Sequence, residues 1–330
     1  MIWLISVTKI FAVICVAVAA LWVVTAVLAA KRVAGWNRDF AAPGQFITVD
    51  GTRVHYETIG DQGPALVLIH GASGNTRDMM QSLAPALADR YRVIVFDRPG
   101  LGWSDPITST DPADQAALLQ RAALALGAER PLVLGHSYGG AVAMAWAIHF
   151  PDHIAGVVDL SGAIYPWPGG VEPLYRVLDR PVGNAVLPTL ASALVTTSFM
   201  QQSVAAAFAP EPALPDYLTR GAVPLVVRPQ SMRANAAQIN DLKRHLTAQS
   251  VHYGALGLPI EILHGDADLV VGLDIHSRRL AETLPQARLT VLAGGGHMIQ
   301  HTRVPQIVAA IDRIAEAAGL NSGPAQAIVP

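Results

Sequence analysis

The sequence contains little cysteine and little charge. Cys15 is the single cysteine, and Asp, Glu, Lys and Arg together make up 15% of the 330 residues. One cysteine excludes an internal disulfide and a thiolate metal site, and we expect no metal and no other cofactor. The formal net charge is -2, and no run of Lys and Arg is longer than two residues. These values argue against a nucleic-acid partner.

The N-terminus carries a long apolar run. Ile10 to Ala30 contains no charged residue, no glycine and no proline. As a helix the run would be about 31 Å long, close to the thickness of a bilayer core. A signal peptide has a shorter apolar region and a small-x-small cleavage site, which Leu28 interrupts here. A buried core helix would normally have a polar face. A membrane anchor over residues 1–32 is therefore favoured over both alternatives.

These observations predict a single-pass membrane protein, such as one of the bacterial inner membrane, with the bilayer as a partner. More Lys and Arg residues follow the apolar run than precede it. This bias favours a cytoplasmic catalytic domain, but the tail before the run is too short to decide the side. We expect residues 33–45 to form a linker, and we expect the anchor to contribute little to the catalytic fold.

Residues 46–318 are predicted to form one α/β domain, followed by a loose C-terminal tail over 319–330. Strands are predicted at 46–49, 54–58, 65–69, 92–96, 132–134, 154–160, 260–263 and 288–292. Helices are predicted at 76–88, 112–126, 141–148, 275–284 and 305–318, with Asp111 as a cap. This alternation predicts a mostly parallel sheet with helices on both faces. It stops at about 161–258, where we predict a helical cap insertion over the carboxyl ends of the strands, the edge at which such sheets place their sites.

The stretch Gly135-His136-Ser137-Tyr138-Gly139 has the G-x-S-x-G pattern. An apolar strand precedes it and an Ala-rich helical run follows it, which is the context of a nucleophile elbow. The alternative is a turn rich in glycine and serine without chemistry, which the strand and helix on either side make less favourable. We therefore predict Ser137 as a nucleophile.

A serine hydroxyl needs a histidine base and a carboxylate that orients the imidazole. Of the 11 histidines, His297 has the best context, after three glycines behind the last strand. His136 is expected to point elsewhere. The remaining candidates are expected at the surface: His149, His153, His245, His252, His276 and His301.

Three aspartates compete for the third position of the triad. Asp268 is favoured because it follows a strand in the order Gly-x-x-Asp, and Asp266 and Asp159 are the alternatives. The backbone N–H of Tyr138, directly after the nucleophile, is predicted to donate to the oxyanion. Ala72, in the turn after the strand at 65–69, is predicted to supply the second donor.

Five motifs in this order resemble the α/β-hydrolase superfamily. They are His70-Gly71-Ala72, Asp97-Arg98-Pro99-Gly100-x-Gly102-x-Ser104, Gly135 to Gly140, Gly265-x-x-Asp268 and Gly296-His297. The resemblance covers about 46–318 and implies an α/β-hydrolase fold with the triad Ser137, Asp268 and His297. It also implies a structural role for Asp97 and Ser104. Related haloalkane dehalogenases and epoxide hydrolases use an aspartate nucleophile, so Ser137 argues against both activities.

The triad predicts a carboxylesterase-like serine hydrolase that cleaves a small, apolar acyl substrate through an acyl-enzyme. Lactonase, thioesterase, amidase, carbon–carbon bond hydrolase and perhydrolase activities use the same triad and stay open. A non-catalytic binding member of the fold is the alternative from another class.

Overall fold

The computed structural model describes residues 2–320 and contains one eight-stranded sheet with the order β1-β2-β4-β3-β5-β6-β7-β8. The strands are β1 (Gln45–Val49), β2 (Thr52–Ile59), β3 (Ala65–Ile69), β4 (Arg92–Phe96), β5 (Leu132–His136), β6 (Gly156–Leu160), β7 (Ile260–Gly265) and β8 (Arg288–Leu292). β2 pairs antiparallel with β1 and β4, and all other neighbouring pairs are parallel. The mostly parallel sheet is therefore confirmed. The predicted tail, apart from residues 319 and 320, lies outside the described residues.

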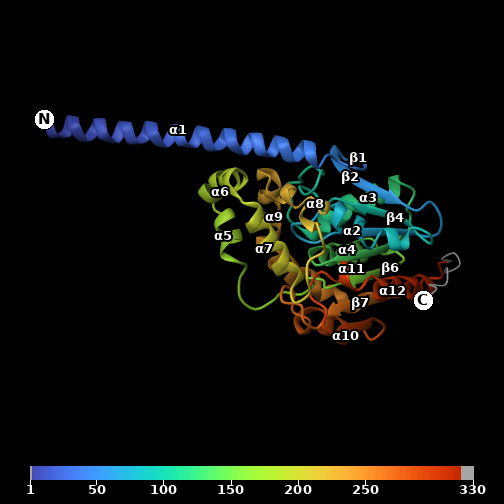
Figure 1. Cartoon of the computed structure of the whole chain (residues 1–330). Helices are drawn as coiled ribbons and strands as arrows, with labels where there is room; N and C mark the ends of the chain where they lie inside the picture. Colours follow the sequence, from blue (N-terminus) through green and yellow to red (C-terminus); the bar gives the residue numbers. More distant parts are fainter. Residues whose placement is uncertain (1, 321–330) are drawn as a thin grey trace.

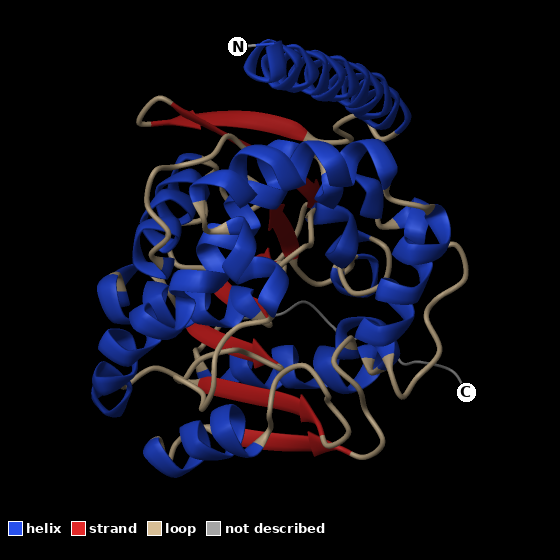
Figure 2. Ribbon diagram, turned by 90° about the vertical axis from the view of Figure 1, so that its left-hand side faces the viewer, coloured by secondary structure: helices blue, strands red, loops and turns tan. Residues whose placement is uncertain are grey.

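Helices lie on both faces of the sheet (Figures 1 and 2). They are α1 (Ile2–Asp39), α2 (Thr76–Met80), α3 (Pro112–Ala125), α4 (Tyr138–His149), α5 (Pro173–Leu178), α6 (Pro181–Leu194), α7 (Thr197–Phe208), α8 (Tyr217–Arg220), α9 (Pro229–Gln249), α10 (Arg279–Thr283), α11 (Ile299–Thr302) and α12 (Val304–Ala317). Two apolar clusters fill the space between the layers, one with Leu119 of α3 and Trp146 of α4, the other with Met79 of α2 and Ile311 of α12. Burial on both faces explains why the central strands are continuous apolar runs.

Local sequence signals explain several boundaries. Asp50 and Gly51 have φ values of 50° and 80°, as a tight hairpin turn between β1 and β2 requires. The Asp111 side chain caps α3 by accepting a hydrogen bond from the Ala113 N–H at 2.9 Å. The helix predicted at 76–88 is shorter than expected because Pro85 cannot donate to a helical carbonyl. α2 ends at Met80, and a separate 3-10 turn covers Pro85–Leu87.

The helix α1 is longer than the predicted anchor. It continues to Asp39, so the residues 33–39 that were predicted as linker are helical. α1 packs against α6, and its buried residues Thr25 and Ala29 are one turn apart on one face. The Arg32 guanidinium donates to the carbonyls of Ala193 and Val195 at the end of α6, at 2.9 and 2.7 Å. These contacts hold α1 against the helix α6, and in the additional turns the Asn37 side-chain oxygen accepts a hydrogen bond from Arg228 at 3.2 Å.

The helices α5 to α9 lie between β6 and β7 in the sequence, and we call residues 173–249 the helical insertion. Its longest helix, α9, contacts the loops that follow β3 and β4. Asn235 accepts a hydrogen bond from the Ser73 N–H at 2.9 Å, and Gln238 donates to the Pro99 carbonyl at 2.9 Å. The insertion therefore covers the carboxyl ends of these strands.

Candidate active site

Ser137 lies in a strained turn between β5 and α4, with φ 54° and ψ -118°. A residue with a Cβ adopts this region only where the surrounding structure enforces it. The neighbouring glycines are required by close contacts. A Cβ on Gly139 would lie 2.3 Å from the Ile69 oxygen, and one on Gly135 would lie 2.1 Å from the Gly139 oxygen. This is the geometry of a nucleophile elbow.

His297 and Asp268 form a hydrogen-bonded pair, with 2.8 Å between Nδ1 of His297 and Oδ2 of Asp268. The other carboxyl oxygen of Asp268 accepts hydrogen bonds from the N–H groups of Val270 and Val271, at 2.8 and 2.9 Å. Burial alone would raise the pKa of Asp268, but the hydrogen bonds from His264, His297 and Val271 outweigh burial and hold this pKa well below its usual value. Asp268 is therefore an ionised partner that holds a proton on Nδ1 of His297.

The two alternative aspartates have other surroundings. Asp266 is exposed and accepts a hydrogen bond from the Gly294 N–H at 2.7 Å. Asp159 is fully buried in β6 against Gly140 and Gly162. Among the described residues, Asp268 is the carboxylate paired with His297. The geometry thus favours the predicted acid over both alternatives.

His264 supports Asp268 and has no clear signal in the sequence. Its Nε2 lies 2.9 Å from the Val271 carbonyl oxygen and 3.2 Å from Oδ2 of Asp268. Because a carbonyl only accepts, Nε2 carries the proton. Its Nδ1 lies 2.6 Å from the Ser277 hydroxyl. His264 therefore contacts the same carboxyl oxygen of Asp268 as His297 does.

The expectation for His136 is wrong, because its ring does not point away from the site. The ring centroids of His136 and His297 are 4.7 Å apart, and Nε2 of His136 lies 3.0 Å from the His297 carbonyl oxygen. Burial and the neighbouring His297 lower the pKa of His136 to about 3. A neutral His136 therefore donates to the main chain of His297 and supports its ring.

The predicted oxyanion donors lie on both sides of the nucleophile. Tyr138 is the first residue of α4, and the first N–H groups of a helix have no acceptor within the helix. Gly71, which precedes Ala72, packs against Ser137, because a Cβ on Gly71 would lie 3.0 Å from the Ser137 Cβ. The turn that contains Ala72 thus lies next to the nucleophile.

Two buried side chains hold this turn. His70 Nε2 accepts a hydrogen bond from the Arg98 N–H at 3.0 Å, so Nδ1 carries the proton and donates to the Gly71 carbonyl at 2.8 Å. Burial lowers the pKa of His70 to about 4 and keeps it neutral. The Arg98 guanidinium lies 4.0 Å from the centre of the Tyr138 ring and donates to the same Gly71 carbonyl at 3.3 Å. Arg98 therefore connects the two predicted oxyanion donors.

Asp97 and Ser104 hold the loop after β4, as the resemblance implied. The Asp97 carboxylate accepts hydrogen bonds from the N–H groups of Thr76 and Trp103, both at 2.7 Å. Ser104 donates from its hydroxyl to the Asp97 carbonyl at 2.8 Å. These contacts support a structural role for both residues.

Two histidines expected at the surface are buried, His276 and His301. His301 Nε2 lies 3.0 Å from the Asp78 carboxylate and Nδ1 lies 2.9 Å from the Ser82 hydroxyl. His297 and His301 have a four-residue spacing that metal sites also use, but their side chains bind different partners. Within residues 2–320, no group of three His, Cys, Asp or Glu side chains is placed to hold a metal ion.

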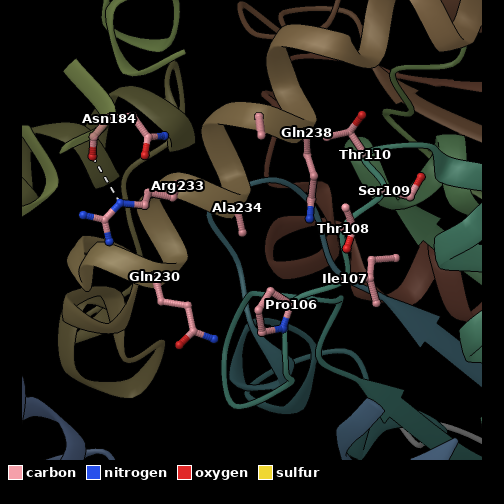
Figure 3. Close-up of a pocket in the computed structure, with 11 residues that line it drawn as sticks. Pro106, Ile107, Thr108, Ser109, Thr110, Asn184, Gln230, Arg233, Ala234 and Gln238 are labelled. Atoms are coloured by element: carbon pink, nitrogen blue, oxygen red, sulfur yellow. Dashed lines mark hydrogen bonds between the residues drawn. The ribbon is translucent and has the colours of Figure 1, made fainter. Parts of the chain in front are cut away.

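A cavity of about 440 Å³ lies between the loop after β4 and the helices α6 and α9 (Figure 3). Its lining combines polar and apolar side chains, and Arg233 donates to the Asn184 carbonyl within it at 3.1 Å. The lining consists of Pro106, Ile107, Thr108, Ser109, Thr110, Asn184, Gln230, Arg233, Ala234, Ala237 and Gln238. The cavity contains no residue of the triad and is therefore separate from the nucleophile.

Comparison with known proteins places this fold in one family. A family model described as alpha/beta hydrolase fold matches residues 64–304, so the chain belongs to the α/β-hydrolase family. A dihydrolipoyllysine-residue acetyltransferase component of the acetoin cleaving system of Cupriavidus necator is 38% identical over 126 residues, which cover 38% of this chain and 33% of that protein. A 2-hydroxy-6-oxo-6-phenylhexa-2,4-dienoate hydrolase of Burkholderia cepacia is 25% identical, with 78% of this chain and 90% of that protein covered.

Solved structures confirm the fold. A meta-cleavage product hydrolase from Pseudomonas fluorescens superimposes with a TM-score of 0.69 and 21% identity, covering 83% of this chain and 98% of that one. At this identity the likeness shows the fold alone.

Proposed function

We propose that the protein is a serine hydrolase that cleaves a carboxylic ester of a small, apolar acyl substrate. The observation that supports this proposal is the 2.8 Å contact between His297 and the ionised Asp268, at the same edge of the sheet as the strained Ser137. A histidine oriented in this way is the base that a serine nucleophile requires.

The reaction has two halves. Ser137 Oγ attacks the carbonyl carbon while its proton passes to Nε2 of His297, and Asp268 stabilises the imidazolium. The oxyanion accepts hydrogen bonds from the N–H groups of Ala72 and Tyr138, each expected to lower the barrier by about 3–4 kcal/mol. The imidazolium then protonates the leaving alcohol. In the second half, water loses a proton to His297 and attacks the acyl-enzyme, and the imidazolium then returns that proton to Ser137 Oγ as the acid leaves.

Cleavage of a carbon–carbon bond next to a ketone is the second candidate. It is favoured by the Burkholderia cepacia relative, whose name gives such a substrate and which matches most of the chain. The same triad serves this reaction, but the leaving group is then a carbon that must be protonated.

The test is a substrate panel on the purified full-length protein. It contains p-nitrophenyl esters from acetate to dodecanoate and 2-hydroxy-6-oxo-6-phenylhexa-2,4-dienoate. We expect ester turnover with an initial burst of p-nitrophenolate equal to the enzyme, and a loss of about 10³-fold or more in kcat for Ser137→Ala. Cleavage of the dienoate without ester turnover would establish the second candidate. No turnover of any substrate would favour a non-catalytic member of the fold.

We further propose that α1 spans a bilayer and anchors the enzyme. α1 is long and apolar enough for one span, and little of it is buried. The full-length protein is expected to resist carbonate extraction and to keep an uncleaved N-terminus by mass. Mature protein that begins after residue 30 in a soluble fraction would instead indicate a signal peptide.

A further inference from the structure

The helical insertion contains a segment that is both uncharged and exposed. No Asp, Glu, Lys or Arg occurs in the segment 181–208, which forms α6 and α7. Val182, Leu194 and Phe199 in this segment are 76%, 64% and 60% exposed. The other exposed residues at the bend and on α7 include uncharged polar ones such as Thr197 and Gln201. A surface without charges over two helices, with large apolar side chains exposed on it, is a candidate interaction site.

The segment is suited to lie along a membrane rather than to cross it. α6 and α7 together are as apolar as a spanning helix, but the chain bends by 106° between them. As single helices they are about 21 and 18 Å long, too short for a bilayer core of about 30 Å. Short apolar helices of this kind bind in the interfacial layer of a bilayer.

α1 contacts α6 near the end of its apolar run. If α1 spans a bilayer, α6 therefore lies at the boundary between the hydrocarbon core and the headgroups. The apolar run of α1 extends to Ala30, so it includes Thr25 and Ala29, where α1 begins to be buried. Lys31 and Arg32 follow the run, and basic residues at the end of a span lie in the headgroup region. Arg32 binds the carbonyls of the two residues that flank Leu194. Figure 1 shows α6 beside α1, with the N-terminal part of α1 extending beyond it.

We propose that residues 181–208 dock into the interfacial layer of the bilayer that α1 spans, with Leu194 and Phe199 in contact with lipid. This inference rests on the proposed membrane span of α1. The docked segment ends at the active site, because Phe208 and Ala209 pack against Gly296, the residue before His297. The enzyme would thereby take an apolar ester directly from the membrane.

The lone native cysteine provides the test. Cys15 lies in the apolar run of α1, and it is labelled with an environment-sensitive fluorophore (NBD) to report on the span. Three further proteins carry Cys15→Ser together with Leu194→Cys, Phe199→Cys or Val251→Cys. Val251 is the matched control because it is 74% exposed and belongs to a turn that packs on α10, across the molecule from α1. Each full-length protein is reconstituted into phosphatidylcholine–phosphatidylglycerol vesicles, with and without doxyl-labelled lipid.

We expect labels at positions 15, 194 and 199 to shift to the blue and to be quenched by the doxyl lipid, and the label at 251 to do neither. Quenching at 15 with equal responses at 194, 199 and 251 would overturn the docking while leaving the span intact. A blue shift at 194 without quenching would overturn it in favour of a protein contact, such as a second copy of the chain. A label at 15 that is exposed to water would overturn the span and the docking together.

Discussion

Arg98 is a fully buried cation that forms no ion pair with a carboxylate among the described residues. Its two terminal nitrogens donate to the side-chain oxygens of Gln115 and Gln238 and to the Gly71 carbonyl, and the guanidinium lies over the face of the Tyr138 ring. Its Nε has no hydrogen-bond partner among the described residues. Burial lowers the pKa of Arg98 only to about 10, so it stays charged at neutral pH. This arrangement fixes the relative positions of the two predicted oxyanion donors.

Arg98→Lys is expected to lower kcat by about 10-fold to 100-fold with little change in KM. An ammonium cannot contact the Gly71 carbonyl and the Tyr138 ring at the same time as a planar guanidinium does, so the two oxyanion donors would lose their relative positions. The measurement is steady-state kinetics on a short-chain ester beside a thermal melt. An unchanged kcat in a folded variant would remove Arg98 from the positioning of the site.

The three candidate aspartates can be separated by activity. Asp268→Asn is expected to lower kcat by about 10³-fold or more, because an amide holds the wrong tautomer of His297. Asp266→Asn and Asp159→Asn should keep most of the activity, since neither side chain pairs with His297. A larger loss in folded Asp159→Asn than in Asp268→Asn would move the acid to β6.

Asp159 predicts a specific pH dependence of stability. Burial raises its pKa to about 7, whereas an unfolded aspartate has a pKa of about 3.9. The folded state therefore holds a proton that the unfolded state releases, so this stabilisation is complete below about pH 4 and is lost as the pH rises to about 7, on the order of 4 kcal/mol. Asp159→Asn should flatten the decline in the free energy of unfolding between about pH 4 and 7. The free energy of unfolding is measured by denaturant titration at each pH. An equal change with pH in both proteins would contradict the raised pKa of Asp159.

Among single residues, those that belong to a motif and follow a strand in a fixed chain order could be predicted from the sequence. Ser137, His297 and Asp268 follow strands in the order that the fold requires, and the contact between His297 and Asp268 supports that prediction. His136 and His264 could not be predicted, because their roles depend on which carbonyl or carboxylate the folded chain brings to each ring nitrogen. Spacing in the sequence contains no such information.

Among the elements, α1 differs most from its prediction. Composition indicates where an apolar run ends, and it placed the end of the anchor at residue 32. The helix continues to Asp39 and packs on the rest of the fold: one face contacts α6, Arg32 donates to two carbonyls at the end of α6, and Asn37 accepts a hydrogen bond from Arg228. Such long-range contacts are not encoded in local propensity. The end of α2, by contrast, has a local signal. Pro85 stands in the sequence, and a break in the predicted helix before it could have been expected.

The two parts of α1 are expected to have different effects on stability. Residues 8–24 are exposed and precede the buried Thr25. Removal of residues 1–24 should therefore leave the melting temperature of the domain almost unchanged. Removal of residues 1–40 should lower it by about 4 °C or more, through loss of the Arg32 hydrogen bonds and of the contact with α6. In the full chain, Arg32→Ala should reproduce part of this loss, whereas Arg38→Ala should not, because exposed Arg38 pairs only with its neighbour Asp39. Equal melting temperatures for both truncated chains would show that α1 adds no stability.

For the molecule as a whole, the alternation of apolar strands and helices predicts the architecture well. Parallel strands buried on both faces have a strong sequence signal, and β3, β4, β5 and β6 are nearly or fully buried. The arrangement of the helices in the insertion is harder to predict, because it depends on contacts with loops rather than on strand pairing. The hydrogen bonds from α9 to Ser73 and Pro99 are examples. The shared motifs specify the fold and not the substrate, so the substrate could not be predicted from them.

The central claim is that Ser137 is an activated nucleophile, and covalent labelling tests it most directly. Full-length protein is treated with a fluorophosphonate, digested, and analysed by mass spectrometry. We expect one label per chain, located on Ser137, absent in Ser137→Ala and strongly slowed in Asp268→Asn. An unlabelled Ser137 in folded protein, or a label that forms equally fast without the Asp268 carboxylate, would contradict the account.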